Sequence, residues 1–321
     1  MMQTGPTNLI TDIAGLAVGN ADDASLCSGV TCLLCDPPAT ASVAIQGGAP
    51  GTRDIALLAP DQTVETVNGL VLSGGSAFGL DAPGGVQSHL AERGIGFPVG
   101  PAIVPIVPGA ILFDLLNGGD KAWGHTPPYR ALGRAAAENA ATDFGLGGAG
   151  AGSGATLADG PGGLGSASCV LENGVTIGAL VAVNAVGSAT MGGRYFAAAF
   201  ERDGEFGGFG LPEATASDLW PPAMKGAADP GANTTIGIIA TDAALTKAQC
   251  QRLAVMAHDG FARALWPSHL PTDGDLIFAV STGARPMKDA LVDMSLIGAA
   301  ASATMARAIA RGVHETRRLT A

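Results

Sequence analysis

Apolar and polar positions in the first third of the chain form short stretches, each ended by glycine or proline. Such stretches are typical of strands joined by turns. The predicted strands in this part of the chain are Ile10–Val18, Val30–Leu34, Ala41–Ile45 and Gly69–Leu72. A helical pattern then extends to Arg93, and the proline-rich stretch Pro101–Phe113 is predicted to be extended.

Strands and helices alternate more regularly in the rest of the chain. The predicted strands here are Val175–Val183, Tyr195–Phe200, Thr235–Ala240 and Leu276–Ser281. The predicted helices are the alanine-rich segment Tyr129–Phe144, a helix opened by a capping box from Thr246 to Gln249, and a long helix from Pro286. This alternation predicts a layered α/β protein.

Ten glycines fall within the 21 residues from Gly145 to Gly165, a stretch without lysine or arginine. We expect a loop in which backbone packs closely against backbone. The spacing Gly145-x-Gly147-x-x-Gly150 matches a dinucleotide-binding fingerprint, but that motif follows a strand, whereas this stretch follows a predicted helix. Dinucleotide binding is therefore not expected.

The composition restricts the class of protein. The chain has 321 residues, of which 47% are hydrophobic and 14% are charged, and this excludes an intrinsically disordered protein. Its 17 basic and 28 acidic residues give a net charge of −11, which disfavours nucleic acid as a partner because phosphate backbones are also negative. The N-terminus lacks the features of a secretory signal, and prolines interrupt the uncharged stretch Ile95–Phe113. We therefore expect a cytoplasmic protein that does not cross a membrane.

Cysteine and histidine spacing gives no metal-binding motif. Cys32 and Cys35 have CxxC spacing, but the chain has no second pair of this kind, and its five histidines form no pair at helical spacing. We interpret the two cysteines as small apolar residues of a strand. Neither a metal nor an organic cofactor is expected.

A tight turn connects the predicted strand Gly69–Leu72 to the helical segment that follows. Gly74-Gly75-Ser76 resembles part of a G-x-S-x-G nucleophile turn, but Phe78 stands where the second glycine of that motif belongs. We instead expect Gly74, Gly75 and Ser76 to present free N–H groups that hold a carbonyl oxygen or an anion.

The most informative segment is the junction of Asn233 and Thr234, where a turn-rich stretch ends and a strand begins at once. A threonine in this position becomes an N-terminal nucleophile if the preceding peptide bond is cut. Its α-amine, with an ordinary pKa of about 7.7–8.0, then serves as general base for its own hydroxyl. The local pattern also fits an ordinary strand start, and Asn233-Thr234-Thr235 fits an N-glycosylation sequon, which the lack of a secretory signal argues against.

Six segments distributed along the chain carry a family resemblance. They are Leu72–Leu80, Val104–Asp114, Gly148–Ala155, Val181–Asn184, Asn233–Ile236 and Pro271–Val280. In this order they resemble the DmpA-type self-processing peptidases, a family that includes L-aminopeptidase/D-amidases, β-peptidyl aminopeptidases and nylon-oligomer (6-aminohexanoate oligomer) hydrolases. The resemblance spans nearly the whole chain.

The resemblance implies an αββα sandwich of the DmpA and ornithine-acetyltransferase type, built as a single large domain. It also implies self-cleavage between Asn233 and Thr234, which divides this domain into an α-chain part, 1–233, and a β-chain part, 234–321. Thr234 would be the nucleophile, and Asn184 would lie beside it to stabilise the oxyanion or orient the substrate, although an asparagine at a strand end is also an ordinary buried polar residue. A homo-oligomer is implied as well, with a tetramer favoured.

The implied site contains two carboxylates and two departures from the family pattern. Asp273 and Asp275 fall where the nylon-oligomer hydrolases have active-site carboxylates, and we expect them to bind the cationic amine of the substrate, although Asp-Gly-Asp also fits a plain turn. Those hydrolases have a catalytic lysine shortly after the glycine-rich loop, whereas this chain has none between Lys121 and Lys225. Phe113 also replaces an active-site tyrosine. Activation is therefore expected to depend more on the α-amine of the nucleophile.

The function expected from the sequence is an amide hydrolase that acts on a small amine-bearing peptide or ω-amino-acid oligomer. The reaction would pass through an acyl-threonine intermediate. Two alternatives remain: an acyltransferase of the ornithine-acetyltransferase type, and an unprocessed, non-catalytic binding protein. Acyl exchange without net hydrolysis distinguishes the first alternative, and the mass of the intact chain distinguishes the second.

Overall fold

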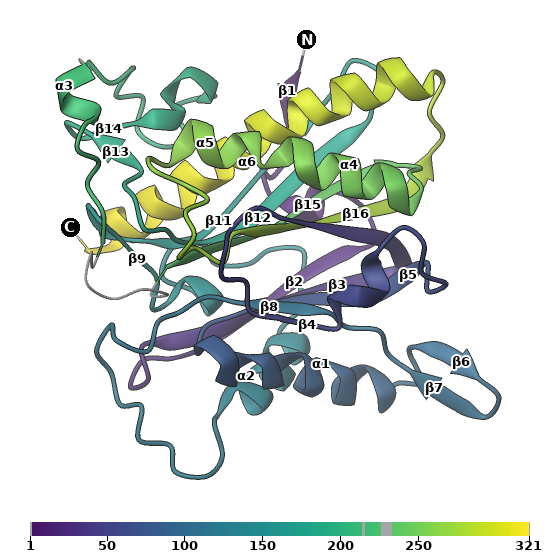
Figure 1. The fold of residues 1–321 in the computed structure, drawn as a ribbon. Coiled ribbons are helices and arrows are strands. Elements are labelled where there is room, and N and C mark those ends of the chain that lie inside the picture. The colour runs from purple at the N-terminus through teal and green to yellow at the C-terminus, as the bar shows by residue number, and fades with distance from the viewer. Residues whose placement is uncertain (1, 214–215, 226–232, 321) are drawn as a thin grey trace.

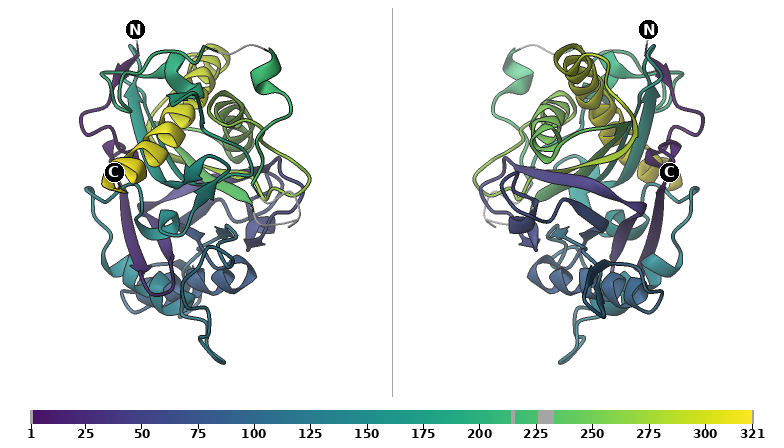
Figure 2. Two further views of the ribbon diagram at one scale, coloured as in Figure 1. Left: turned by 90° about the vertical axis from the view of Figure 1, so that its left-hand side faces the viewer. Right: turned by 90° about the vertical axis from the view of Figure 1, so that its right-hand side faces the viewer.

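Two β-layers lie face to face between two layers of helices (Figures 1 and 2). The structure, a computed structural model, describes residues 2–213, 216–225 and 233–320. Helices α4 (Lys247–Ala257), α5 (Asp259–Ala264) and α6 (Ala290–Thr320) cover one layer, and α1 (Ala82–Ala91) and α2 (Tyr129–Glu138) cover the other. The predicted αββα sandwich is confirmed.

The first layer contains the strand that begins at Thr234. Its order is β1 (Gln3–Thr4), β11 (Gly163–Val170), β12 (Thr176–Asn184), β15 (Thr234–Ala243), β16 (Leu276–Arg285) and the C-terminal part of β3 (Ser28–Ile45). Neighbouring strands run antiparallel except β15 and β16, which are parallel. Strand β15 is therefore central, with β12 on one side and β16 on the other.

The second layer is built around the N-terminal part of β3. This part pairs with β2 (Leu16–Asp23) and β5 (Thr66–Ser73), and the layer continues through β8 (Gly109–Ile111) to β4 (Thr52–Arg53). The register of β3 with β5 is irregular between Leu34 and Ala39, close to the point where β3 passes from one layer to the other. The two strands predicted within residues 30–45 are thus parts of one long strand.

Alternating side chains of the strands separate three apolar cores. In β12, Leu180 belongs to the core between the two layers, whereas Val181 belongs to the core beneath α4, α5 and α6. The third core lies between the second layer and helices α1 and α2, where Tyr129 is fully buried. Because successive side chains of a strand point to opposite faces, an uninterrupted apolar run such as Val175–Val183 is buried on both.

Glycines allow α1 and α2 to pack with their backbones close together. A Cβ on Gly85 would lie 2.0 Å from the Arg130 carbonyl oxygen, and a Cβ on Gly133 would lie 2.1 Å from the Ala82 carbonyl oxygen. Glycine is unfavourable inside a helix by itself. The close contact between the two helices explains why α1 has a glycine at position 85 and α2 has one at position 133.

Two predicted strands are partly helical. The segment Ile10–Val18 begins with the 3-10 helix Ile10–Asp12, and only its end belongs to β2. The segment Tyr195–Phe200 is mostly the 3-10 helix Phe196–Phe200, because its three central alanines favour helical backbone over a strand.

Two predicted helices are shorter than their sequence patterns. Helix α2 ends at Glu138 instead of Phe144. Helix α6 begins at Ala290 instead of Pro286, because the Asp293 carboxylate accepts two backbone N–H groups of the preceding turn at 2.7 and 3.1 Å and holds that turn outside the helix.

The remaining elements are short. The strands are β6 (Phe97–Val99), β7 (Ala102–Val104), β9 (Thr156–Leu157), β10 (Gly160–Pro161), β13 (Thr190–Met191) and β14 (Arg194–Tyr195), and the short helices are α3 (Ala216–Leu219) and the 3-10 helices Ile55–Leu58, Ser76–Asp81 and Gly150–Gly152. Within the predicted connection Gly204–Asn233, residues 214–215 and 226–232 lie outside the described residues. Across the described ranges, no helix combines the length and apolar character needed to span a bilayer.

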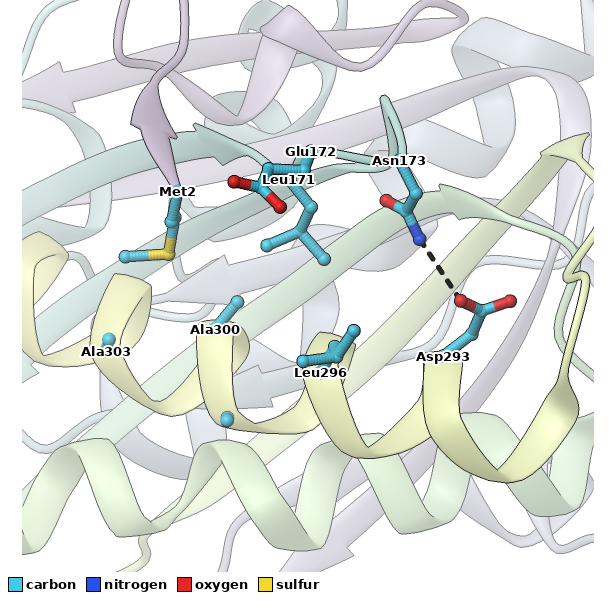
Figure 3. Close-up of a pocket in the computed structure, with 9 residues that line it drawn as sticks. Met2, Leu171, Glu172, Asn173, Asp293, Leu296, Ala300 and Ala303 are labelled. Carbon is cyan, nitrogen blue, oxygen red and sulfur yellow. Dashed lines mark hydrogen bonds between the residues drawn. The ribbon is translucent and has the colours of Figure 1, made fainter.

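A groove of about 550 Å³ runs along the first half of α6 (Figure 3). Met2 and Leu171 form one side of it, and Leu296, Ala300 and Ala303 of α6 form the other. At one end of the groove, Asn173 Nδ2 donates a hydrogen bond to Asp293 Oδ1 at 3.2 Å.

Candidate active site

The start of β15 is held between a strand and a turn, and this brings the predicted site residues together. Asn184, the last residue of β12, is the register partner of Thr234. On the other side, Asn233 forms a parallel bridge with Asp273. These four residues and Asp275 are all buried, each with an exposed fraction of 3% or less.

The Thr234 hydroxyl lies against the peptide bond that precedes it. It donates a hydrogen bond to the Asn233 carbonyl oxygen, which also accepts the Gly274 N–H at 3.3 Å. A Cβ on Gly274 would lie only 2.7 Å from Thr234 Oγ1, so glycine permits this close approach. The hydroxyl is thus next to a carbonyl group that a backbone donor polarises.

The Asn184 carboxamide is fixed by three neighbours. Its Oδ1 accepts the Thr156 N–H at 2.9 Å and the Lys225 ammonium at 3.0 Å, and its Nδ2 donates to the Phe113 carbonyl oxygen at 2.8 Å. Phe113, which stands where the family pattern has a tyrosine, therefore contacts Asn184 through its backbone carbonyl group. These contacts fix the orientation of the Asn184 side chain beside Thr234.

Lys225 places an ammonium against the glycine-rich loop, although it is distant from that loop in the sequence. Its Nζ donates to Thr156 O at 3.1 Å, Thr156 Oγ1 at 3.0 Å and Asn184 Oδ1 at 3.0 Å. Burial lowers the pKa of Lys225 to about 8, although the nearby Asp273 carboxylate acts in the opposite direction. At pH 7 the side chain is therefore mainly an ammonium, whose three N–H donors match these three acceptors.

No local sequence signal marks Lys225 as a site residue. The chain has no other lysine between Lys121 and Lys247, and Lys225 stands nine residues before Thr234 in a polar, proline-rich connection. The tertiary fold brings this connection to Thr156, at the end of the glycine-rich loop where the family pattern places its lysine. The scarcity of lysine in this part of the chain is the only hint that the sequence contains.

Asp273 has one carboxylate oxygen in use and one without a partner. Its Oδ2 accepts the Leu270 N–H at 2.9 Å, whereas its buried Oδ1 has no hydrogen-bond partner among the described residues. Burial, together with the neighbouring Asp275 carboxylate, raises the pKa of Asp273 to about 6. Asp273 is therefore mainly ionised at pH 7, and one of its buried oxygens has no hydrogen-bond partner among the described residues.

Asp275 uses both of its oxygens within the protein. Its Oδ1 accepts the Thr235 N–H at 2.7 Å, and its Oδ2 accepts the His269 backbone N–H at 3.1 Å and contacts His269 Nδ1 at 2.8 Å. This geometry differs from the expectation that Asp275 binds a substrate amine. Asp275 instead positions the backbone directly after Thr234, and His269 holds the carboxylate in place.

The turn at Gly74, Gly75 and Ser76 also differs from its expected role. The three N–H groups donate to Gly29 O at 2.9 Å, Asp114 Oδ1 at 2.7 Å and Leu112 O at 3.0 Å, respectively, so none of them is free. Gly75 has a φ of +83°, and a Cβ there would lie 2.1 Å from the Tyr129 ring. The turn is therefore a packing element close to the site.

The described residues contain no group of three or more histidine, cysteine, aspartate or glutamate side chains arranged to hold a metal ion. Cys32 and Cys35 are free and buried in two different cores, and burial raises the pKa of each thiol to about 12.

The sandwich has an Ntn hydrolase-like fold, and the cluster of buried polar groups lies at the start of its central strand β15. Residues 8–321 match the profile of peptidase family S58. The chain belongs to this family, the DmpA family of aminopeptidases and amide hydrolases, and the resemblance recognised in the sequence is confirmed.

Relatives agree with this assignment, and solved structures share the fold. An uncharacterized aminopeptidase of Mycobacterium tuberculosis is 41% identical over 325 residues, which cover 95% of this chain and 93% of that protein. A 6-aminohexanoate-oligomer endohydrolase of Kocuria sp. is 30% identical over 292 residues, which cover 87% of this chain and 76% of that protein. The structure of a β-aminopeptidase from Burkholderia sp. has a TM-score of 0.67 at 22% identity and covers 97% of this chain and 88% of its own. The L-aminopeptidase D-Ala-esterase/amidase from Ochrobactrum anthropi, described as a variant of the Ntn hydrolase fold, has a TM-score of 0.65 at 21% identity, with coverages of 96% and 86%.

Proposed function

We propose that this chain is a self-processing amide hydrolase in which Thr234 is the nucleophile, acting on short peptides or ω-amino-acid oligomers with a free amine. The observation that carries the proposal is the position of the Thr234 hydroxyl against the Asn233 carbonyl group. Membership of the DmpA family supports the reaction class, because its relatives include aminopeptidases and an oligomer hydrolase.

Processing is the first reaction of this proposal. Thr234 Oγ attacks the Asn233 carbonyl carbon, and the C–N bond breaks as the nitrogen takes up a proton, which leaves an ester and a free α-amine. The Gly274 N–H stabilises the oxyanion that forms on the Asn233 oxygen. Water then hydrolyses the ester and gives chains 1–233 and 234–321.

Turnover repeats the attack on a substrate amide. The freed α-amine of Thr234 accepts the proton of its own hydroxyl, Oγ attacks the substrate carbonyl, and water hydrolyses the acyl-threonine after the amine product leaves. Asn184, held by Lys225 and Thr156, orients the reacting groups, and the Lys225 ammonium adds positive charge where the oxyanion develops. No step requires a metal or an organic cofactor.

Asp273 binds the substrate ammonium in this proposal. Its unpartnered Oδ1 supplies the acceptor, and its charge supplies an attraction that is strong because the site is buried. Asp275 takes a different role from the one expected from sequence, because both of its oxygens already hold the backbone on either side of the site.

The mass of the purified chain tests the proposal. We expect two fragments that divide the chain between residues 233 and 234, and a single intact chain for Thr234→Ala. Thr235→Val is the matched control, because it removes a neighbouring hydroxyl that has no partner among the described residues. Two fragments in Thr234→Ala would assign the cut to a contaminating protease and contradict the proposal.

Hydrolysis of amino-acid anilides and of 6-aminohexanoate oligomers is the second part of the test. The wild type should release product, and Thr234→Ala should not. Transfer of the acyl group to an added amine without net hydrolysis would identify the acyltransferase alternative. An intact wild-type chain that binds these compounds unchanged would identify the binding-protein alternative.

A further inference from the structure

An apolar cavity of about 560 Å³ lies beside the end of helix α5, outside the cluster of catalytic groups. It is lined mainly by Trp220, Pro221, Met224, Trp266, Pro267 and Leu270. Several of these side chains are exposed to an unusual degree for their size: Trp220 is 73% exposed, Met224 44% and Trp266 42%. Large apolar side chains that surround a cavity and remain exposed indicate a binding site.

Two of the lining residues connect the cavity directly to the candidate active site. Met224 precedes Lys225, whose ammonium contacts Asn184. Leu270 donates its N–H to Asp273 Oδ2 and thereby fixes the carboxylate whose other oxygen is unpartnered. Through these two residues, the wall of the cavity adjoins the candidate active site.

The wall formed by Trp266 is held rigidly. Its backbone N–H and carbonyl oxygen pair with Ser188 at 2.9 Å each, and its indole Nε1 donates to the Leu219 carbonyl oxygen at 3.1 Å. Ser188 lies four residues after Asn184 in the chain, so one short segment carries both a residue of the candidate site and the backbone partner of Trp266. A fixed aromatic face binds apolar and aromatic groups with little loss of conformational entropy.

From this arrangement we propose that the cavity binds the side chain of the substrate's amino-terminal residue, and that preferred substrates carry a large apolar or aromatic side chain there. This inference rests on the proposed function, because it places the substrate ammonium on Asp273. Among the described residues that line the cavity, none carries a charged side chain, which argues against acidic or basic substrate residues. The volume falls within the range of small-molecule sites and exceeds what an alanine side chain fills.

Tryptophan fluorescence tests binding independently of catalysis. The chain has three tryptophans, and two of them, Trp220 and Trp266, line the cavity. The probe is phenethylamine, which combines an ammonium with an aromatic ring and cannot be hydrolysed. The control is ethylamine, which has the ammonium but lacks the aromatic ring. We expect a saturable change in emission with phenethylamine alone, which persists in Trp123→Phe and disappears in the Trp220→Phe/Trp266→Phe double variant.

Substrate selectivity tests the same inference through kinetics. In Trp266→Ala, the ratio of kcat/KM for a phenylalanyl anilide to that for a glycyl anilide should fall at least about tenfold, because the aromatic wall is lost. Trp123→Phe should leave this ratio unchanged. Trp220→Glu, at the most exposed lining position, should shift the preference from phenylalanyl toward lysyl anilides even if Trp266→Ala fails to fold.

The outcomes separate this inference from the proposed function. A fluorescence response without any anilide hydrolysis would support the cavity and contradict the proposed function. Hydrolysis with unchanged selectivity in both variants, together with no response to phenethylamine, would overturn the cavity inference alone. A change of emission on dilution without probe that is lost in the Trp220→Phe/Trp266→Phe double variant would show that a second copy of the chain covers the cavity, and would also overturn it.

Discussion

Gly274 passes so close to Thr234 that any side chain would meet the Thr234 hydroxyl. A Cβ there would lie 2.7 Å from Thr234 Oγ1 and 2.9 Å from the Ala49 carbonyl oxygen. We therefore expect Gly274→Ala to slow self-cleavage by at least about tenfold, since displacement of a positioned group by even 1 Å is costly. A time course of fragment appearance on gels measures this.

Gly148→Ala is the matched control for that substitution. Its Cβ would meet nothing within 4 Å, and its φ is not in the left-handed region. It should process at the wild-type rate. Equal rates in all three proteins would show that the approach of Gly274 to Thr234 is irrelevant to processing.

Asp273 should add a step near pH 6 to the acidic side of the pH profile, below the step expected from the α-amine of Thr234. Its pKa is raised to about 6, so kcat/KM for free-amine substrates should rise as pH passes through 6 and the carboxylate becomes charged. Asp273→Asn should remove this rise and lower kcat/KM at least about tenfold, the size expected for loss of a charge-assisted pair. N-acylated substrates provide the control, because they carry no ammonium. A similar loss for both kinds of substrate would place Asp273 in proton transfer.

Lys225 should act on the chemical step rather than on substrate binding. Lys225→Met removes the ammonium that contacts Asn184, and we expect kcat to fall about 10²-fold with a smaller change in KM. Because the pKa of Lys225 is lowered to about 8, wild-type activity should decrease above pH 8, and this dependence should be weaker in the variant. Single-turnover kinetics on processed protein measure it, and an unchanged kcat would remove Lys225 from the mechanism.

At the scale of single elements, local chemistry predicted some features well. The capping box at Thr246 opens α4 as expected, with the Thr246 and Gln249 side chains each holding the other's backbone N–H. The apolar run Val175–Val183 predicted β12 with an error of one residue at each end. The junction of Asn233 and Thr234 predicted where β15 begins. Each of these features is determined by residues that are neighbours in the sequence.

Features that depend on distant partners could not be predicted in this way. The position of Lys225 depends on the fold that brings it to Thr156, and the role of Asp275 depends on the hydrogen bond that it accepts from the Thr235 N–H, which lies 40 residues away in the sequence. The continuity of β3 between the layers depends on strands on either side of it. In each case, the deciding hydrogen bonds join segments whose contact is not encoded locally.

Helix α6 is fastened to the first layer by an ion pair in which the Arg307 side chain is fully buried and the Glu205 side chain is 7% exposed. Arg307 donates to Glu205 at 2.5 and 2.9 Å, and also to Ser168 O at 3.0 Å and Asn8 Oδ1 at 2.9 Å. Glu205→Ala would leave the buried guanidinium without its carboxylate, which should lower the free energy of unfolding by about 3–5 kcal/mol. Urea denaturation measures this loss.

Glu213→Ala is the control for that substitution. Glu213 pairs with Arg194 at 3.0 Å, but its side chain is 88% exposed. Loss of this surface pair should cost no more than about 1 kcal/mol. Comparable losses in the two variants would mean that burial does not determine the strength of the α6 attachment.

At the scale of the whole molecule, the β6–β7 hairpin presents an apolar surface without charge. Phe97, Val99, Ile103 and Val104 are 44–56% exposed, and the 20 residues 94–113 contain no charged side chain. A separate two-stranded hairpin is only marginally stable in water. We therefore propose that it packs against another copy of the chain in a homo-oligomer, for which the family resemblance favours a tetramer.

Light scattering tests this proposal directly. The wild type should have the mass of an oligomer, and Val99→Asp combined with Ile103→Asp should lower that mass, since charges would be buried at the contact. Leu319→Asp, at an exposed apolar position far from the hairpin in the sequence, should leave the mass unchanged. A monomer at all concentrations of the wild type would refute the oligomer.

The order of strands in the first layer has a consequence for a chain that has been cut before Thr234. Strands β15 and β16 follow the cut, yet they lie between β12 and β3, which precede it. The two fragments would thus share one sheet and could not part without unfolding. Refolding of the uncut chain is a unimolecular process, whereas refolding of the cut protein requires two polypeptides to meet, so its rate would depend on concentration. The cut would therefore convert a chain that refolds by itself into a two-chain assembly, which would re-form more slowly the more it is diluted.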